Sequence, residues 1–347
     1  MYNFADVNLK TLVVHSVGNK VQEEGMKLSK APIQVEEEIN TLLLKYFLSP
    51  FKSEVYYTFF HDADLNLNEL FNYSCKIFSD PECFFLQSIN ITKHLYDSSD
   101  HHNIKGGEFY LTYMENCILD GEYVDAIGLF KSENKDTYLK VYQKTDNFDI
   151  EADHGININK LDKGCIIFNT ETEKGYKVLI VDSTNKSNEA QYWKNDFLKV
   201  KPREDSYFHT QNYLHLCKDF CDEVLTKRNE VEKADKIMIM NRSLNYFQEK
   251  ETFNIKEFEN EVMEGPELIQ AFQTFKNDYI ARNNLNTYEE FDISESAVKS
   301  SKKIFKSILK LDKNFHIYIH GNRDMIVKGF DEERGLNYYQ LFFKEER

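Results

Sequence analysis

The chain has 347 residues, of which 41% are hydrophobic and 14% aromatic, and its formal net charge at pH 7 is −15. This length favours two domains over a single core, and the many aromatic side chains supply enough apolar area to bury. The negative charge disfavours nonspecific adhesion to nucleic acid, so any contact with a polyanion requires a local cluster of basic residues.

Targeting and redox signals are sparse. The N-terminus lacks a basic stretch followed by a long apolar run, which is the pattern of a signal peptide. No run of 18 apolar residues occurs, so we expect no membrane span and a cytoplasmic location. The six cysteines form no CxxC pair, and in a chain that is not exported we expect them to be reduced and buried.

The first part of the chain mixes strand and helix signals. Strands are expected at Leu9–Val17 and Val55–Phe60, with a helix over Ile33–Phe47 between them. Two further helices are expected at Asn66–Phe78 and Pro81–Tyr96, the second opening on a proline in its first turn.

From Gly107 onward the helical periodicity disappears. Short β-rich runs separated by turn residues predict strands at Glu108–Asn116, Tyr123–Lys131, Tyr138–Gln143, Cys165–Asn169 and Tyr176–Asp182. Strands at this spacing, without helices between them, indicate an antiparallel meander. The simplest packing places the preceding helices on one face of that sheet.

A second domain is expected after residue 205, because the pattern becomes helical again. Helices are predicted over Tyr207–Leu225, Glu230–Gln248, Ile255–Met263 and Glu267–Arg282. The chain therefore reads as an α+β protein. Residues 1–205 form an antiparallel sheet with flanking helices, and residues 206–347 form a helical domain that closes with a short antiparallel β-meander.

The closing stretch reverses the charge of the chain. From Lys299 to Lys328 there are eight basic residues and two acidic ones. On a helix turning about 100° per residue, five lysines share one face, with apolar side chains opposite. These are Lys299, Lys303, Lys306, Lys310 and Lys313.

After this predicted helix, Phe315–His320 alternates as a strand, a turn follows at Gly321-Asn322, and Met325–Lys328 is expected to return as the partner strand. His316 and His320 lie on one strand face, but a rise of ~3.3 Å per residue separates their Cα atoms by about 13 Å. That separation argues against a shared metal ion.

The lysine row allows two interpretations. One is a solvated helix face without a ligand. The other is contact with phosphates by the five lysines together with Arg323. The sequence contains no zinc-finger, basic-zipper or RNP pattern, so we expect DNA binding to involve the backbone of double-stranded DNA with low sequence specificity.

Phe315–Glu346 (FHIYIHGNRDMIVKGFDEERGLNYYQLFFKEE) resembles the end of the 37-kDa bacterial nucleoid-associated (NdpA-like) proteins, in the form typical of Bacteroidetes. Five other segments resemble this family in the same order: Val13–Lys20, Ala126–Val141, Leu161–Asn169, Asn188–Leu198 and Ala234–Phe247. The resemblance implies a non-enzymatic, nucleoid-located protein that binds DNA and has no established catalytic residue.

Enzyme signatures are missing from the sequence. It contains no GxxxxGK[ST], GxGxxG, GxSxG or HExxH pattern, so no catalytic residue, metal or cofactor is expected. His209, His215, Cys217 and Cys221 cluster, but the two thiols lie one helical turn apart on a predicted apolar face, which favours core packing over zinc. The run GLFKSENK is interpreted as a strand end followed by a charged turn.

Two functions therefore remain open. The first is a nucleoid-associated protein that binds DNA through the lysine row. The second is an interaction module of a DNA-processing or chromosome-maintenance assembly that does not contact DNA itself, using its acidic remainder to bind a basic partner. A homodimer joined through an edge strand at Tyr338–Phe343 is a further hypothesis.

Overall fold

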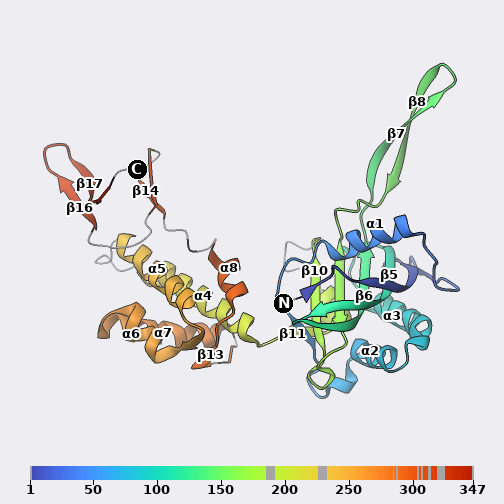
Figure 1. The fold of residues 1–347 in the computed structure, drawn as a ribbon, viewed down its shortest axis with the longest axis horizontal. Helices are drawn as coiled ribbons and strands as arrows, with labels where there is room; N and C mark the ends of the chain where they lie inside the picture. Colours follow the sequence, from blue (N-terminus) through green and yellow to red (C-terminus); the bar gives the residue numbers. More distant parts are fainter. Residues whose placement is uncertain are drawn as a thin grey trace. The chain divides into compact units, whose positions relative to one another are not determined.

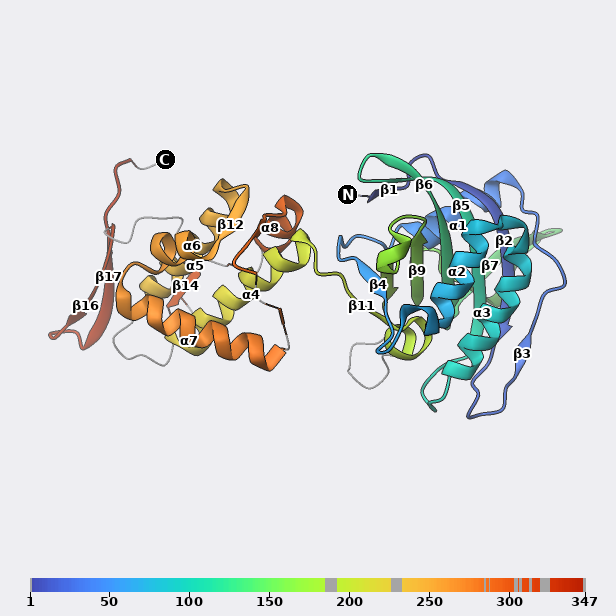
Figure 2. The same ribbon diagram turned by 90° about the horizontal axis from the view of Figure 1, so that it is seen from below.

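The structure is a computed structural model that describes residues 2–184, 192–225, 233–283, 285–286, 288–302, 305, 308–311, 314–318 and 325–345. The chain divides into two compact units, Met1–Arg203 and Glu204–Arg347. Figures 1 and 2 show their elements from two directions. The predicted α+β class is confirmed, with a large antiparallel sheet in the first unit and short antiparallel sheets near the C-terminus.

An antiparallel sheet forms the centre of the first unit, in the order β11-β4-β10-β9-β6-β5-β2-β3, with β1 beside β5. Its strands are β1 (Tyr2–Asn3), β2 (Asn8–Val17), β3 (Met26–Lys27), β4 (Tyr57–Phe59), β5 (Gly107–Leu119), β6 (Glu122–Ser132), β9 (Lys163–Phe168), β10 (Lys177–Asp182) and β11 (Val200–Pro202). Strands β5, β6, β9 and β10 are consecutive neighbours, as expected of a meander.

Helices cover both faces of this sheet, so the prediction that they share one face is wrong. Helix α1 (Glu37–Leu48) packs on one face, where Phe47 stacks on Phe130 with ring centroids 4.3 Å apart. Helices α2 (Glu69–Ser79) and α3 (Phe84–Ser98) pack on the other face (Figure 1).

The reason for two covered faces lies in the central strands. Ile127 and Leu129 of β6 belong to the core beneath α2 and α3, whereas the next residue, Phe130, belongs to the core beneath α1. In β9, Ile166 and Ile167 divide between the two cores in the same way. A strand that is apolar on both sides must be covered on both sides. Short helices complete the unit at Leu65–Leu67, Pro81–Cys83 and Thr172–Lys174, with a π-helical turn at Trp193–Leu198.

A two-stranded arm leaves the sheet between β6 and β9. It consists of β7 (Asp136–Lys144) and β8 (Asn147–Gly155), which pair with each other along their whole length. Figure 1 shows it extending away from the sheet as a green ribbon. Tyr138–Gln143 was correctly predicted as a strand, but its expected place in the meander is wrong, and β8 was not predicted.

The second unit is built around phenylalanine side chains. Its helices are α4 (Ser206–Glu223), α5 (Lys233–Glu249), α6 (Ile255–Met263), α7 (Pro266–Asn283) and α8 (Glu295–Ser301). Strands β12 (Thr252–Asn254) and β13 (Glu290–Asp292) pair beside them. Phe220, Phe253, Phe258 and Phe272 are fully buried in this core. Side-chain caps begin helices α4, α6 and α8: Asp205 accepts the amide of Phe208 at 3.0 Å, Asn254 caps α6 and Ser294 caps α8.

The chain ends in two hairpins, which correct the prediction for this region. Strand β14 (Ile308–Leu311) pairs with β15 (Phe315–Tyr318), and β16 (Ile326–Asp331) pairs with β17 (Leu336–Leu341). The predicted long helix therefore ends at Ser301, and Met325–Lys328 contributes to a hairpin with β17 instead of pairing with β15.

Packing explains this outcome. Phe305 is buried in the phenylalanine core, whereas Leu311 and Ile317 pack in a separate small cluster with Ile237 and Ile326. The chain must leave the helix to reach both clusters, and tertiary contacts here override helical periodicity.

Candidate nucleic-acid interface and buried charge cluster

The predicted lysine row does not lie on one helix face. Lys299 lies exposed near the end of α8, with its Nζ 3.3 Å from a carboxylate oxygen of Glu295, one turn earlier. Lys310 lies in β14, opposite His316. The other four predicted contacts, Lys303, Lys306, Lys313 and Arg323, lie outside the described residues. The helix that was expected to align the five lysines is thus replaced by a short helix and a strand.

The surroundings of Lys299 are mixed in charge. Lys299 and Lys302 line a groove of about 640 Å³ that also contains Glu249, Glu251 and Glu295. Carboxylates at this position oppose a phosphate by like-charge repulsion. Lys328 of β16 is exposed in the following hairpin.

Basic side chains near the junction of the two units are engaged within the first unit. Lys199 contacts Glu69 at 2.9 Å, and Arg203 forms an ion pair with Glu171. Lys194 lies over the ring of Tyr57, 4.8 Å from its centroid. Their contacts indicate a structural role.

The sequence interpretation missed two lysines that are buried beneath the base of the arm. Lys131, at the end of β6, is 0% exposed and Lys163, at the start of β9, is 1% exposed. Both ammonium groups lie over the ring of Tyr192, at 5.4 and 5.2 Å from its centroid. These cation–π contacts partly replace the hydration that each lysine loses.

Each buried ammonium also has hydrogen-bond acceptors. Lys131 Nζ donates to Glu133 Oε1 at 3.0 Å and to the carbonyl oxygen of Lys105 at 2.7 Å. The Tyr192 hydroxyl accepts from Lys131 at 3.0 Å and donates to Glu133 at 2.9 Å. Burial lowers the pKa of Lys131, and the Glu133 carboxylate opposes that shift. Burial raises the pKa of Tyr192 well above its usual value, and Glu133 adds to the rise.

Lys163 joins a second strand end to the same cluster. Its Nζ donates to Asp182 Oδ1 at 2.9 Å and to Thr184 Oγ1 at 2.7 Å. Asp162 accepts the backbone amides of Glu133 and Asn134 at 2.6 and 2.9 Å. These contacts fix the ends of β6, β9 and β10 where the chain departs into the arm. The interpretation of GLFKSENK as a strand end followed by a charged turn agrees with the end of β6 at Ser132, but it did not anticipate that the side chains of Lys131 and Glu133 are buried.

A groove of about 920 Å³ opens above this cluster. Its basic lining residues are Lys45, Lys52, Lys105 and Lys160. The two carboxylates that also line it, Glu133 and Asp162, already accept the hydrogen bonds described above. The groove is polar, and the chemistry that its walls offer is hydrogen bonding and charge pairing.

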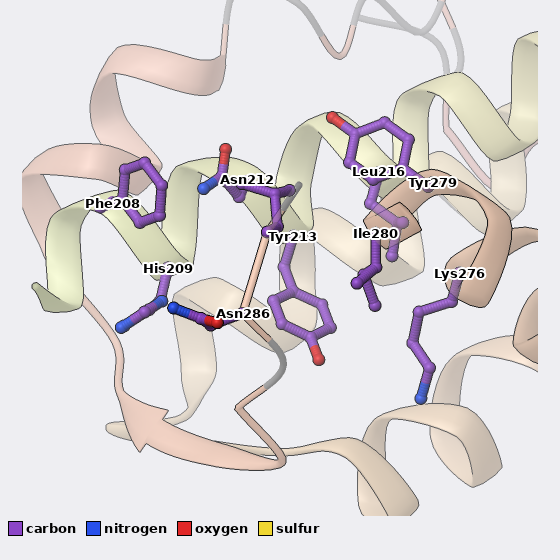
Figure 3. Close-up of a pocket in the computed structure, with 10 residues that line it drawn as sticks. Phe208, His209, Asn212, Tyr213, Leu216, Lys276, Tyr279, Ile280 and Asn286 are labelled. Atoms are coloured by element: carbon purple, nitrogen blue, oxygen red, sulfur yellow. The ribbon is translucent and has the colours of Figure 1, made fainter. Parts of the chain in front are cut away.

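His209, Cys217 and Cys221 of the second unit serve packing. Figure 3 shows His209 on α4 beside a cavity of about 30 Å³, which is close to the volume of one water molecule. Its ring centroid lies 4.1 Å from that of Tyr288. Cys217 and Cys221 are buried in the phenylalanine core, and burial raises the pKa of Cys221 to about 12.

The described residues contain neither a cluster of metal-ligating side chains nor a helix that could span a membrane. They contain no group of three or more His, Cys, Asp or Glu side chains placed to hold a metal ion. Among the helices in these parts of the chain, none combines the length and the hydropathy needed to cross a bilayer.

Comparison with known proteins gives one family. Residues 13–334 match the family model described as "Nucleoid-associated protein YejK". No individual curated protein matches the chain significantly. The matched range includes most of both units and ends within the turn between β16 and β17.

Proposed function

The chain belongs to the nucleoid-associated protein YejK family, and on this basis we propose that it binds DNA in the nucleoid through its basic segment, residues 299–328. The contacts that we propose are Lys299, Lys303, Lys306, Lys310, Lys313 and Arg323. The proposal includes a cytoplasmic location, since the nucleoid lies in the cytoplasm.

The observation that carries the proposal is the charge of this segment. It contains eight basic residues and two acidic ones in a chain whose net charge is −15. Lysine ammonium groups bind phosphates as point charges and release condensed counterions from DNA. Such contacts do not read bases, so we expect binding to double-stranded DNA with little sequence preference.

Fluorescence anisotropy with a labelled duplex at rising salt tests the proposal. We expect the triple variant Lys303→Glu, Lys306→Glu, Lys310→Glu to reduce affinity at least tenfold. It should also flatten the slope of log K against log salt by about 3, since each lost phosphate contact contributes about 0.9.

A matched control keeps the change in net charge constant. Lys30, Lys93 and Lys256 are exposed and lie outside the segment, so changing all three to Glu alters the net charge by the same amount. We expect this control to bind with nearly the original salt slope. Equal losses in the two triple variants would contradict a site in the segment, because they would reflect net charge alone.

A second function is favoured by the carboxylates beside Lys299 and by the two-stranded arm, on which Leu139, Phe148 and Ile150 are exposed. In this function the chain is an interaction module within a DNA-maintenance assembly and binds protein rather than DNA. Co-purification with and without nuclease separates the two functions. A partner that remains after the DNA is digested supports the module, whereas a partner lost with the DNA supports direct DNA binding.

We infer a binding role rather than catalysis. The two buried lysines are both engaged by carboxylates and by Tyr192. Both lysines are buried, and their ammonium groups are engaged in contacts within the unit.

A further inference from the structure

The arm formed by β7 and β8 has one polar face and one apolar face. In an antiparallel pair, directly opposed residues share a face. Leu139 lies opposite Ala152, Val141 opposite Ile150, and Gln143 opposite Phe148. This face therefore carries Leu139, Val141, Phe148, Ile150 and Ala152, together with Gln143 and, at the base of the arm, Thr137 and His154, and we call it the apolar face.

The apolar face is open to solvent in the described parts of the chain. Leu139 is 68% exposed, Val141 60%, Phe148 74% and Ile150 61%. A two-stranded ribbon is marginally stable by itself, and monomeric proteins rarely present a continuous apolar strip of this kind. On this face, no charged side chain lies between Leu139 and Val141 or between Phe148 and Ile150, so the apolar strip is continuous.

Side chains on the polar face form hydrogen bonds and ion pairs with one another. The Tyr138 hydroxyl donates to Asp153 at 3.2 Å, and Lys144 Nζ lies 2.8 Å from Asp149. The Tyr142 hydroxyl donates to Glu151. Over residues 136–155 there are five acidic residues and two lysines, so the arm as a whole repels a phosphate backbone. The partner that fits is an apolar protein surface.

We propose that the apolar face binds the same face of a second copy of this chain. In this arrangement a two-fold axis lies between the two stacked faces at Ile150 and runs perpendicular to the strands. The two arms then point in opposite directions, and β8 of one copy lies over β8 of the other. Ile150 then meets its own copy, and Phe148 of each arm lies over Ala152 of the other. The largest side chain of the face thus meets the smallest, which is the complementarity that an isologous interface requires.

The area and the charges are compatible with this arrangement. If on each copy Phe148 loses roughly 150 Å², Leu139, Val141 and Ile150 roughly 100 Å² each and Ala152 roughly 50 Å², the two arms bury about 1,000 Å² together, near the lower limit for a specific interface. The charged side chains face away from the contact on both copies, so their repulsion is screened by solvent. The inference does not depend on DNA binding.

Analytical ultracentrifugation of the full chain tests the inference with two variants of strand β8. Ile150→Lys places a charge in the centre of the apolar face. Asn147→Lys places the same residue three positions earlier, on the polar face. We expect a concentration-dependent dimer for the original chain and for Asn147→Lys, with at least a tenfold weaker dimer for Ile150→Lys.

Cross-linking identifies the contact directly. Because Ile150 meets its own copy, Ile150→Cys should form a disulfide-linked dimer under mild oxidation, and Asn147→Cys should not. Unchanged circular dichroism verifies that the two units remain folded. A monomer at all concentrations would overturn the inference, as would a dimer that Ile150→Lys leaves intact. The second result would place the dimer contact elsewhere and leave the arm for a different protein.

Discussion

At the residue scale, the position of a lysine decides whether its ammonium group stabilises the fold or is free to contact a ligand. Lys131 and Lys163 are fully buried and lie over the ring of Tyr192, where they hold strand ends together. Lys299 is exposed and has one carboxylate partner on its own helix. The first kind of lysine contributes to the stability of the fold, and only the second kind can contact a phosphate.

We expect Lys131→Met to lower the free energy of unfolding of the first unit by ~3–5 kcal/mol, because it leaves the carboxylate of Glu133 buried without its cation. The double variant Lys131→Met, Glu133→Gln should regain much of this loss. Urea unfolding followed by fluorescence of Trp193 measures the effect, since the chain has a single tryptophan. That residue is fully buried in the first unit.

Lys10→Met is the control for this experiment. Its Nζ lies 2.6 Å from Glu115, but its side chain is half exposed, so its loss should cost no more than about 1 kcal/mol. Equal costs for Lys131→Met and Lys10→Met would show that the buried pair has no special role.

The stability of the first unit should fall in mild acid because of His15. Its Nδ1 accepts the amide of Ser29 at 3.0 Å, and burial lowers the pKa of His15. The folded state therefore resists protonation, while the unfolded state gains a proton as pH falls through about 6.5. The contribution is complete above that pH and is lost progressively below it.

The variant His15→Gln tests this pH dependence, because glutamine can accept a hydrogen bond but does not titrate. We expect the urea midpoint, followed by Trp193 fluorescence, to fall between about pH 7 and about pH 5 in the original chain. The fall should be smaller in His15→Gln. An identical fall in both proteins would assign the acid sensitivity to other groups.

The sequence carried a signal for the buried lysines that its interpretation did not use. Lys131 follows the apolar run from Ala126 to Phe130, and Lys163 precedes the apolar run from Gly164 to Phe168. A lysine in register with a buried strand must be paired. Its partners Tyr192 and Asp182 are distant in the sequence, so only the folded chain could identify them.

At the element scale, regular periodicity predicted most helices and strands well. Helices α4 to α7 and strands β2, β5, β6, β9 and β10 lie close to their expected positions. The prediction failed at Ile308–Leu311, which forms β14, because the spacing of lysines and apolar residues fits a helix as well as a strand there. The separate burial of Phe305 and Leu311 resolves that ambiguity, and it depends on residues such as Ile237 that are far away in the chain.

The start of α6 offers a test at this scale. Asn254 Oδ1 accepts the backbone amides of Lys256 and Glu257 at 3.1 and 3.3 Å. Asn254→Ala should lower the stability of the second unit by about 1 kcal/mol, because it leaves these helix-terminal donors without a partner. Thermal unfolding followed by circular dichroism measures the change. Lys256→Ala, an exposed change in the same helical turn, should have little effect, and a similar loss in both would argue against the cap.

At the scale of the whole molecule, positive charge is concentrated in a short segment of an acidic chain. In the proposed function, the basic segment attracts DNA against the repulsion of the remainder. Repulsion from nearby carboxylates persists at physiological salt, whereas repulsion from distant ones is screened beyond a Debye length of about 8 Å. The acidic turn at Glu332 and Glu333 follows the basic segment directly.

This difference predicts the effect of removing negative charge. Glu332→Gln with Glu333→Gln should raise DNA affinity several-fold at about 0.15 M salt, where screening is short-ranged. Glu267→Gln with Asp278→Asn removes the same charge from exposed positions on α7 and should have a smaller effect. At about 0.01 M salt, where the Debye length reaches about 30 Å, both pairs should raise affinity. Fluorescence anisotropy at the two salt concentrations measures the DNA affinity of each variant. Equal gains in affinity for the two pairs at about 0.15 M salt would mean that the net charge of the molecule controls binding, and not the field around the basic segment.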